Sequence, residues 1–580
     1  MKKGFTMIEM LGIVVLIALI SLFSFPAINT LTKNASTQKY NNFIKILDTA
    51  ADTYIEYNFE KYDNMDEQYI STKTLIENGY LSETLINPNT KTTVLDENGI
   101  IIITKNIDRS LNYEYSLNEY FVIDSIEALM DLEVNVNSGN NYSNKIIILS
   151  KDLDFKDPNS YVDSTTTAYG DINGDGNTSQ LIVELTTIKG FKPIGNSSNS
   201  FEGTFNGDMY TINNLYINRS LETEVGLFGY ISGAKITNLN INGTVNGSDN
   251  TGLIVGSAVS NSEISNINAD FKTYYSCPSC TVINVGGIAG IVTNTTVNKI
   301  NINIQINLDA SSLGGLIGRA TDSTVSNIIE SGSINSSKDN IGGIIGYATN
   351  TSLSDIEASG KIVGGNYVGG IFGKIENALT INNLANKASV TGINQVGGIA
   401  GTVSNSTLTY SNNSAIIEGT SNVGGIAGTA TGATIELSNI TGNITGINQV
   451  GGIVGTSTDT TILNNYIVNN VEGTNQVGGI IGYMASSTIT NNYISGTITA
   501  SSECGGLIGL ATNSSVLNYS FFNTTKNSTI PIIGTNTSST NTGSSGLTNE
   551  QMKDAEYYTN WDFINTWKIE NNFYPTLRNE

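Results

Sequence analysis

The sequence predicts an N-terminal transmembrane α-helix, a small α+β head and a large all-β, right-handed parallel β-solenoid, in that order along 580 residues. Two observations lead to this architecture. An apolar run from Leu11 to Phe25 follows a basic start. A glycine-rich motif then occurs eleven times at a spacing of 27 or 28 residues, with one interval of 34. A chain of this length is too long for one compact core, so at least two domains are expected.

The first ten residues combine a basic start with a carboxylate at the edge of an apolar run. Glu9 stands at that edge, where insertion of a carboxylate into a bilayer costs about 2.5–3.5 kcal/mol. No small-x-small cleavage site follows the run, which argues against an ordinary secretory signal. A cut after Gly4 would place the new ammonium of Phe5 four residues before Glu9, on the same helix face. The helix dipole would also favour a carboxylate in this first turn.

This stretch resembles the prepilin leader of the type IV pilin and pseudopilin family. The resemblance implies cleavage between Gly4 and Phe5 by a prepilin peptidase, N-methylation of Phe5, and a Glu9 that recruits the subunit into a filament of other pilin subunits. Pilins commonly carry a proline at the distance of Pro26, which we expect to kink the helix. The alternative is a plain signal anchor with an isolated glutamate.

After the leader, 1–4, the segment 5–59 is predicted as the pilin N-terminal helix, with its membrane part at about 5–31. Apolar residues at three- and four-residue spacing predict one buried face, formed by Phe43, Ile44, Leu47, Ala50, Ala51 and Tyr54. Residues 60–118 predict a small α+β head, with a short helix that ends at Gly79 and a strand from Gly99 to Ile103. The order of these elements resembles the head of pilins from bacteria with a single membrane, although any small α+β domain would also fit.

The remaining chain predicts the solenoid: an opening segment with the first coils at 119–225, repeats at 226–534, and a linker with a capping segment at 535–580. The repeated motif is apolar-Gly-Gly-apolar-small/apolar-Gly, as in Val285–Gly290. Three short β-branched segments per period predict a three-sided coil, with glycines at tight corners and between stacked coils. Leucine-rich repeats have a similar period, but their L-x-x-L-x-L pattern is missing. These motifs, which we call glycine boxes, resemble the GLUG repeat of bacterial surface proteins.

Composition argues against several classes of function. The net charge of −23 disfavours nucleic acid as a partner, because phosphate binding needs basic patches. Histidine is absent, which excludes His-containing triads and His-ligated zinc. The acidic residues of the repeats occupy different positions from one repeat to the next, whereas glycosidases and lyases need clustered acidic residues. We therefore expect no enzymatic activity and no cofactor.

Two motifs deserve separate interpretation. Alternating oxygen ligands at Asp171, Asn173, Asp175 and Asn177 fit a weak structural calcium loop, but Ile182 stands where the bidentate acid is expected, so a polar turn is the preferred interpretation. Cys277 and Cys280 lie in the repeat with the 34-residue interval, and a loop disulfide is favoured there over a free or reactive pair. A third cysteine, Cys504, is expected to be a small buried hydrophobe.

Together these features predict a pilin-like subunit, minor or at the tip of a filament, that displays the solenoid for surface adhesion or spacing. It would reside in the cell membrane before assembly and at the extracellular surface afterwards. Its ligand there, a glycan or a protein, is not specified by the sequence. The alternatives are a membrane-anchored adhesin that does not polymerise, and a pseudopilin of a secretion or uptake system.

Overall fold

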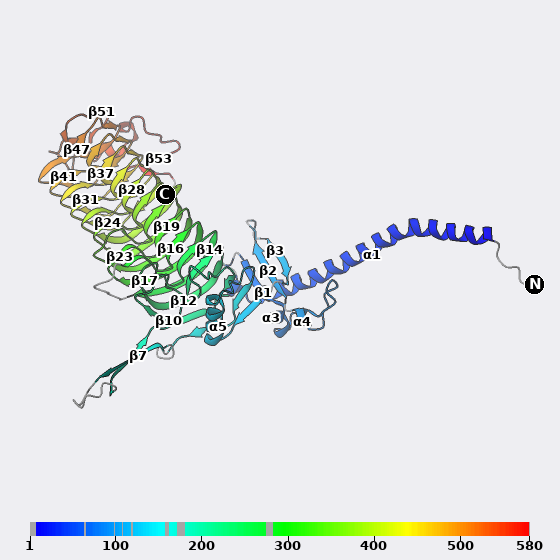
Figure 1. Ribbon diagram of the computed structural model, residues 1–580. Coiled ribbons are helices and arrows are strands. Elements are labelled where there is room, and N and C mark those ends of the chain that lie inside the picture. The colour runs from blue at the N-terminus through cyan, green and yellow to red at the C-terminus, as the bar shows by residue number, and fades with distance from the viewer. Residues whose placement is uncertain are drawn as a thin grey trace, which may run out of the picture. The chain divides into compact units, whose positions relative to one another are not determined.

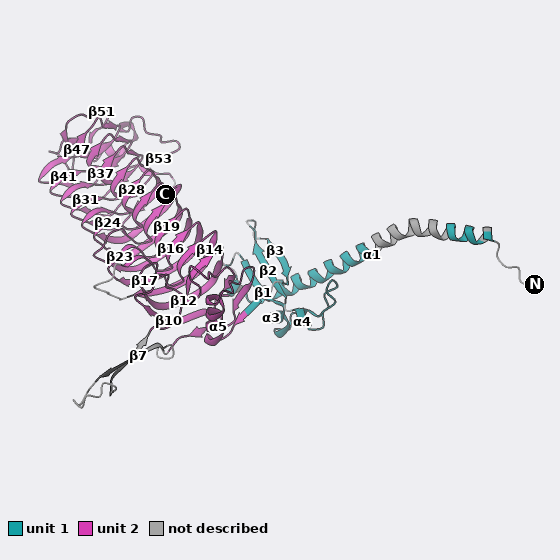
Figure 2. Cartoon of the chain, in the orientation of Figure 1, with its two compact units in different colours: residues 1–121 teal, residues 122–580 magenta. Residues whose placement is uncertain are grey.

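The computed structural model describes residues 7–578 apart from 63–64, 66, 98, 107, 109, 118–119, 157–161, 171–179 and 274–281, and apart from the side chains of 8–9, 12, 16–31, 59–60 and 162–188. The chain forms two compact units, residues 1–121 and 122–580 (Figure 2). Each unit has its own buried core.

Unit 1 is a small α+β unit built on one long helix. Its helices are α1 (Met7–Tyr57), α2 (Phe59–Tyr62), α3 (Thr72–Glu77) and α4 (Val94–Glu97). Its strands are β1 (Glu67–Ser71), β2 (Ile100–Lys105) and β3 (Leu111–Ser116), which form an antiparallel sheet in that order. The Ser71 hydroxyl caps α3 by accepting a hydrogen bond from the Thr74 amide, and Gly79 follows the helix with a φ of +78°. The predicted short helix and strand are therefore present.

The second half of α1 contacts the rest of unit 1 through one apolar face. Phe43, Leu47 and Ala51 are at most 3% exposed, and Ile44 is half-buried. The Phe43 ring packs edge-on to Tyr115 with 5.6 Å between centroids, and Tyr54 packs in the same way against Tyr80 at 5.5 Å. The Tyr113 hydroxyl donates a 2.6 Å hydrogen bond to the Asp52 carboxylate at the edge of this contact.

The prediction of a transmembrane helix, with its membrane part at about 5–31, is wrong. Among the described residues, no helix combines the length and the hydropathy that crossing a bilayer requires. The part of α1 beyond residue 31, which lies outside the predicted membrane segment, has a buried apolar face formed by Phe43, Leu47 and Ala51. That is the pattern of a helix packed by one face against other elements.

Near its start, unit 2 has a helix, α5 (Ile126–Asn137), within the range 119–225 for which the sequence predicts an opening segment and the first coils. The Ser125 hydroxyl caps it by accepting from the Ala128 amide at 3.1 Å. Leu129, Leu132 and Val136 form its buried face. At its end, Asn137 donates to the Pro193 carbonyl and accepts from the Gly195 amide, so α5 is fixed to the loops of the first coils.

The rest of unit 2 is a parallel β-solenoid whose coils stack in chain order (Figure 1). The first sheet consists of β11 (Phe228–Ser232), β13 (Val255–Val259), β16 (Ala289–Thr293), β19 (Ile317–Thr321), β22 (Ile345–Thr349), β25 (Phe372–Glu376), β28 (Ala400–Ser404), β32 (Ala427–Thr431), β37 (Val454–Thr458), β42 (Ile481–Ala485), β47 (Ile508–Thr512) and β50 (Ile533–Asn536). The second sheet consists of β15 (Val282–Gly286), β18 (Ala310–Gly314), β21 (Ile341–Gly342), β24 (Asn366–Gly369), β27 (Asn394–Gly397), β31 (Ser421–Gly424), β36 (Asn448–Gly451), β41 (Asn475–Gly478) and β46 (Ser502–Gly505).

The third sheet covers the remaining length of each coil. It consists of β4 (Tyr120–Ile123), β5 (Ile146–Leu149), β6 (Leu153–Asp154), β9 (Thr204–Asn206), β10 (Thr211–Arg219), β12 (Lys235–Gly247), β14 (Ser262–Thr273), β17 (Thr295–Asn307), β20 (Thr324–Asn335), β23 (Ser352–Val363), β26 (Thr380–Thr391), β29 (Thr407–Asn413), β30 (Ile417–Glu418), β33 (Thr434–Glu436), β34 (Asn439–Ile440), β35 (Ile444–Thr445), β38 (Thr461–Leu463), β39 (Tyr466–Ile467), β40 (Val471–Glu472), β43 (Thr488–Thr490), β44 (Tyr493–Ile494), β45 (Ile498–Thr499), β48 (Val516–Asn518), β49 (Phe521–Asn523), β51 (Thr540–Thr542) and β52 (Ser545–Leu547). Outside these sheets, β7 (Val162–Gly170) pairs with β8 (Gln180–Ile188), and β53 (Trp567–Lys568) with β54 (Thr576–Leu577).

One repeat of the sequence makes one coil. Ile341 pairs with Val368, and Gly342 with Gly369, so equivalent residues of successive boxes lie directly over one another. Hydrophobic side chains in these registers point into a common core, in which Ile344, Ile371 and Ile399 are fully buried. The parallel solenoid predicted from the repeats is therefore confirmed.

The coils turn at residues with a left-handed backbone, among which asparagine is the most frequent type. A positive φ recurs at three places in each coil, and asparagine tolerates this conformation better than most residues. Asparagines with a φ between 47° and 59° at these corners include Asn250, Asn284, Asn294, Asn327, Asn340, Asn350, Asn383, Asn405, Asn422, Asn464 and Asn491. The glycines of the boxes do not have a positive φ. The expectation that they form the corners is wrong, because residues outside the boxes, most often asparagine, occupy those positions.

The box glycines are needed where one coil passes close to the next. A Cβ atom on Gly343 would lie 2.1 Å from the carbonyl oxygen of Gly370, and one on Gly315 would lie 2.0 Å from that of Gly343. Neither neighbour can move away easily, because both are backbone atoms held in the stack. Close packing, the second expected role of these glycines, is thus confirmed.

The solenoid continues beyond its expected end. The linker predicted from residue 535 instead forms β51 and β52, which pair with β48 and β49 of the preceding coil, while β50 pairs with β47. The polar composition of this stretch suggested a loose connection. Pairing with the preceding coil supplies hydrogen-bond partners for its backbone groups. This stretch therefore forms strands despite its polar composition.

We expect Gly343→Ala to lower the free energy of unfolding by about 1–3 kcal/mol, because the added methyl group overpacks a backbone contact. The midpoint of urea unfolding, followed by circular dichroism, measures the change. Ser333→Ala, at an exposed position of the neighbouring strand β20, is the control and should leave the midpoint unchanged. Equal midpoints for both variants would contradict the packing role of the box.

Candidate functional site

Most residues singled out from the sequence lie outside the described part of the structure. Gly4 and Phe5 precede it, and the side chains of Glu9 and Pro26 are not included, although both residues belong to the span of α1. Their roles in processing, assembly and kinking stay predictions.

The two loop motifs also fall outside it. Cys277 and Cys280 lie within 274–281, and the calcium-loop residues Asp171, Asn173, Asp175 and Asn177 lie within 171–179. Among the described residues, no group of acids and cysteines is arranged to hold a metal ion. Cys504 is described as a free thiol on β46, in register with Val477, and it is partly exposed. Burial raises the pKa of this thiol.

The structure reveals a candidate surface in the outer side of the third sheet. One position per coil forms a column there, and we call it the outer column. It consists of Asn240, Asn268, Asn301, Ile329, Glu357, Ala385, Asn412, Asn439, Tyr466, Tyr493 and Phe521. Its first eight members are at least partly exposed, whereas its three aromatic members are buried.

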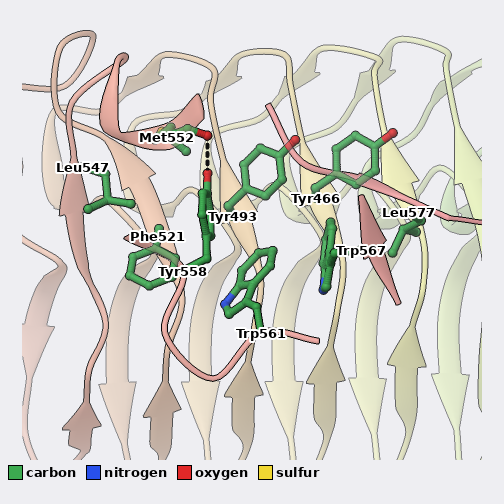
Figure 3. Close-up of a cluster of buried hydrophobic side chains, with 9 residues drawn as sticks. All are labelled: Tyr466, Tyr493, Phe521, Leu547, Met552, Tyr558, Trp561, Trp567 and Leu577. Atoms are coloured by element: carbon green, nitrogen blue, oxygen red, sulfur yellow. Dashed lines mark hydrogen bonds between the residues drawn. The ribbon is translucent and has the colours of Figure 1, made fainter. Parts of the chain in front are cut away.

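The C-terminal segment, Thr548–Arg578, accounts for the burial of the aromatic members of the outer column. Figure 3 shows Trp561, Trp567 and Tyr558 of this segment packed against the rings of the outer column. Tyr466 and Tyr493 stack with 5.4 Å between centroids and 8° between planes. We expected the segment to close the end of the solenoid, but it lies along the outer face across three successive coils.

Directional hydrogen bonds fix the C-terminal segment to those coils. The Trp567 indole N–H donates to the Asn464 side-chain oxygen at 3.2 Å, and the Trp561 indole N–H donates to the Tyr519 carbonyl at 2.8 Å. The Tyr493 hydroxyl donates to the Pro575 carbonyl at 2.6 Å. Within the segment, the hydroxyl of Tyr558 donates to the Met552 carbonyl, and burial raises the pKa of Tyr558. The contact therefore satisfies the polar ends of the aromatic side chains as well as burying their rings.

A charged cluster lies on the outer side of the first sheet. The guanidinium carbon of Arg319 lies 4.9 Å from the centre of the Tyr347 ring, in cation–π geometry. The Lys374 ammonium lies 2.7 Å from the Glu376 carboxylate, and the Tyr347 hydroxyl also donates to that carboxylate. Hydrogen bonds from Lys374 and then Tyr347 lower the pKa of Glu376. The cluster links three coils and combines two cations, Arg319 and Lys374, with the single carboxylate of Glu376.

One carboxyl group is buried inside the solenoid. Glu330 on β20 is 2% exposed and lies in register between Ile302 and Ala358. Its Oε2 has no hydrogen-bond partner among the described residues. Burial raises the pKa of Glu330 well above its usual value, and a hydrogen bond from the Ser359 amide offsets this only in part. Burial therefore disfavours the charged form of Glu330 in the folded protein.

Comparison with known proteins gives limited similarity, and no family model matches the chain. A 107-residue stretch, 17% of this chain, is 32% identical to "Putative Gly-rich membrane protein" of Evansella cellulosilytica and spans 12% of it. A 116-residue stretch, 19% of this chain, is 31% identical to "Halomucin" of Haloquadratum walsbyi and spans 1% of it. The chain thus spans only a small part of the length of either relative.

Among solved structures, the chain is similar to a crystal structure described as a putative immunoglobulin A1 protease from Bacteroides ovatus. The similarity has 13% identity and covers 79% of this chain and 92% of that one, with a TM-score of 0.26. A TM-score this low carries no argument about fold or function.

We expect Trp567→Ala to detach the C-terminal segment, because the lost side chain is fully buried and substitutions of this kind cost about 3–5 kcal/mol. The chain has two tryptophans, so the emission of Trp561 alone should shift to the red, and limited proteolysis should cut after residue 547. Phe573→Ala, at a side chain that is 66% exposed, serves as the control. Unchanged emission and cleavage in Trp567→Ala would contradict the proposed attachment.

We expect Glu330→Gln to stabilise the protein at neutral pH. The pKa of Glu330 is higher folded than unfolded, so stability is greatest below the unfolded pKa and falls as pH rises towards the folded pKa. Unfolding midpoints at pH 4 and pH 7 measure the effect, with the gain present at pH 7 and nearly absent at pH 4. Glu418→Gln, at an exposed position, should show no such pH-dependent gain, and the same gain in both variants would contradict burial as its cause.

Proposed function

We propose that the protein is a pilin-like subunit, minor or at the tip of a filament, that displays its β-solenoid at the cell surface for adhesion or spacing. The observation that carries the proposal is the regular outer face of the solenoid. Its outer column is at least partly exposed and mainly polar over its first eight members, and it becomes buried and aromatic under the C-terminal segment. A face of this kind is suited to contact with an external ligand in water.

The rigidity of unit 2 supports a role in display. Each coil is bonded to its neighbours by parallel backbone ladders, with the box glycines in close contact. Stacked repeats of this type hold a surface at a defined distance from its attachment point. Unit 2 contains most of the chain, so a filament in which every subunit carried it would be crowded. That crowding favours a minor or tip position over the major building block.

The N-terminal part supports assembly into a filament. The residues from Gly4 to Glu9 resemble a prepilin processing site, and α1 is a 51-residue helix whose second half packs by one face in a small α+β unit. The first half would then be available to contact equivalent helices of neighbouring subunits. Glu9 would pair with the N-terminal amine of one of them.

The similar proteins support a surface location, since the name of one refers to a membrane and that of the other to a mucin. The acidic composition disfavours direct contact with nucleic acid. We propose that the protein has no enzymatic activity, because its repeats carry few charged residues. An adhesin that does not polymerise is the main alternative, and a pseudopilin of a secretion or uptake system is another.

The N-terminal peptide of the protein in filaments sheared from cells tests processing and assembly together. We expect mass spectrometry to find a peptide that begins at N-methylated Phe5. Protein that begins at Met1 and is absent from sheared filaments would contradict the proposal and favour the adhesin that does not polymerise.

Substitution of Glu9 tests assembly separately from processing. We expect Glu9→Ala to reduce incorporation into filaments at least tenfold, because the partner of the N-terminal amine is lost, while the cellular level of the protein is maintained. Quantitative immunoblots of sheared and cell-bound fractions measure the ratio. Glu77→Ala, at an exposed residue of unit 1, is the control. Incorporation of Glu9→Ala at the level of the control would contradict a role for Glu9.

A further inference from the structure

A groove crosses the outer side of the third sheet at its first coils. It has a volume of about 550 Å³ and is partly open to solvent. Residues from β10, β12 and β14 line it, together with Phe155 and Lys156, which follow β6. Those from the strands are Asn214, Leu215, Tyr216, Asn242, Gly243, Thr244, Asp270 and Lys272.

We propose that this groove binds a neutral oligosaccharide. The inference deepens the proposed function, on which it rests, by assigning the adhesive contact to one site and its ligand to one chemical class. The C-terminal segment covers the outer face only at the other end of the solenoid, over Tyr466, Tyr493 and Phe521. The C-terminal segment therefore leaves the outer face of the first coils uncovered.

Local irregularities of the backbone create the groove. The pairing of β10 with β12 shifts in register between Ile212 and Leu215, at a point where Asn214 has a φ of 57°. Gly243 of β12 contributes no side chain at the floor, and a Cβ there would lie 2.3 Å from the Leu215 carbonyl oxygen.

One aromatic ring in the groove is suited to a sugar. Tyr216 is half-buried, and its ring lies against the backbone of Gly190, where a Cβ would be 2.8 Å from its Cδ1. The ring is thereby held in place while it lines the groove. Pyranose rings present C–H groups on one face, and the negative face of an aromatic ring attracts such groups.

The polar groups of the groove are oriented before any ligand binds. The Asn242 amide donates to the Asn213 side-chain oxygen at 2.8 Å and accepts from the Asn214 backbone N–H at 2.8 Å. The Asp270 carboxylate accepts from the Asn303 amide at 3.1 Å. Planar amide and carboxylate groups with fixed directions can each serve two neighbouring hydroxyls, and prior ordering reduces the entropy lost on binding.

The charges of the groove occur in opposite pairs, which favours an uncharged ligand. The Lys156 ammonium lies 3.0 Å from the Asp154 carboxylate, and the Lys272 ammonium lies 3.9 Å from that of Asp270. An anionic ligand would compete with both carboxylates, and a cationic one with both lysines. A neutral polyol can instead accept hydrogen bonds from the lysines and donate to the carboxylates.

Binding by the purified full-length protein tests the proposal. The probes are short neutral oligosaccharides of glucose, galactose and N-acetylglucosamine, together with sialylated counterparts of the same length. We expect at least one neutral probe to bind, with at least tenfold weaker binding by Tyr216→Ala and substantial recovery by Tyr216→Phe. Tyr483→Ala, at a half-buried outward position on β42, is the matched control and should bind as the unsubstituted protein does.

Each outcome separates this inference from the proposed function. The groove proposal is overturned if no neutral probe binds, if the sialylated probes bind better, or if Tyr216→Ala binds as strongly as Tyr483→Ala. Circular dichroism confirms that the variants are folded. Incorporation of Tyr216→Ala into filaments should remain normal, whereas a failure of the Glu9 experiment would contradict filament assembly and leave the binding result intact.

Discussion

The backbone ladder between coils is the constraint on which the rest of unit 2 depends. Successive coils are bonded residue over residue, as Ile341 is to Val368. This register holds only where the chains can approach closely, which requires glycine at positions such as Gly343. It also requires three turns at fixed places in every coil, where asparagine with a positive φ is the most frequent residue. Because equivalent residues are stacked, a substitution at one position first perturbs the contacts with the two neighbouring coils.

Because the coils stack, equivalent positions form columns along the solenoid. The residue types in a column then determine which parts of its surface are exposed to water. The outer column is polar at Asn240, Asn268 and Asn301 and aromatic at Tyr466 and Tyr493, although all occupy equivalent places in the coil. The difference follows from the C-terminal segment, which provides the apolar partner for the aromatic members. The C-terminal segment does not cover the polar part of the face or its groove.

The sequence predicted the coils well and the surroundings of the coils less well. Repeat period, box glycines and β-branched segments were sufficient for the parallel solenoid, because each depends on contacts between equivalent residues. The helix α5 was missed, since its apolar residues Leu129, Leu132 and Val136 were attributed to opening coils. The processing and assembly residues Gly4, Phe5 and Glu9 rest on resemblance alone. The predicted membrane segment was wrong among the described residues.

By itself the sequence determined the period, the residues that face the core and the close-contact glycines, because these are local or repeated features. Only the tertiary structure decided where the aromatic residues of the C-terminal segment pack. Trp561 and Trp567 pack along the outer face of the third sheet and do not cover the last coil of the solenoid. The rings that complete their hydrophobic cluster belong to three different coils. It likewise decided the groove, which combines a register shift on β10 with Gly243 on β12 and Lys156 beyond β6. Such sites join residues distant in sequence, and no periodicity marks them.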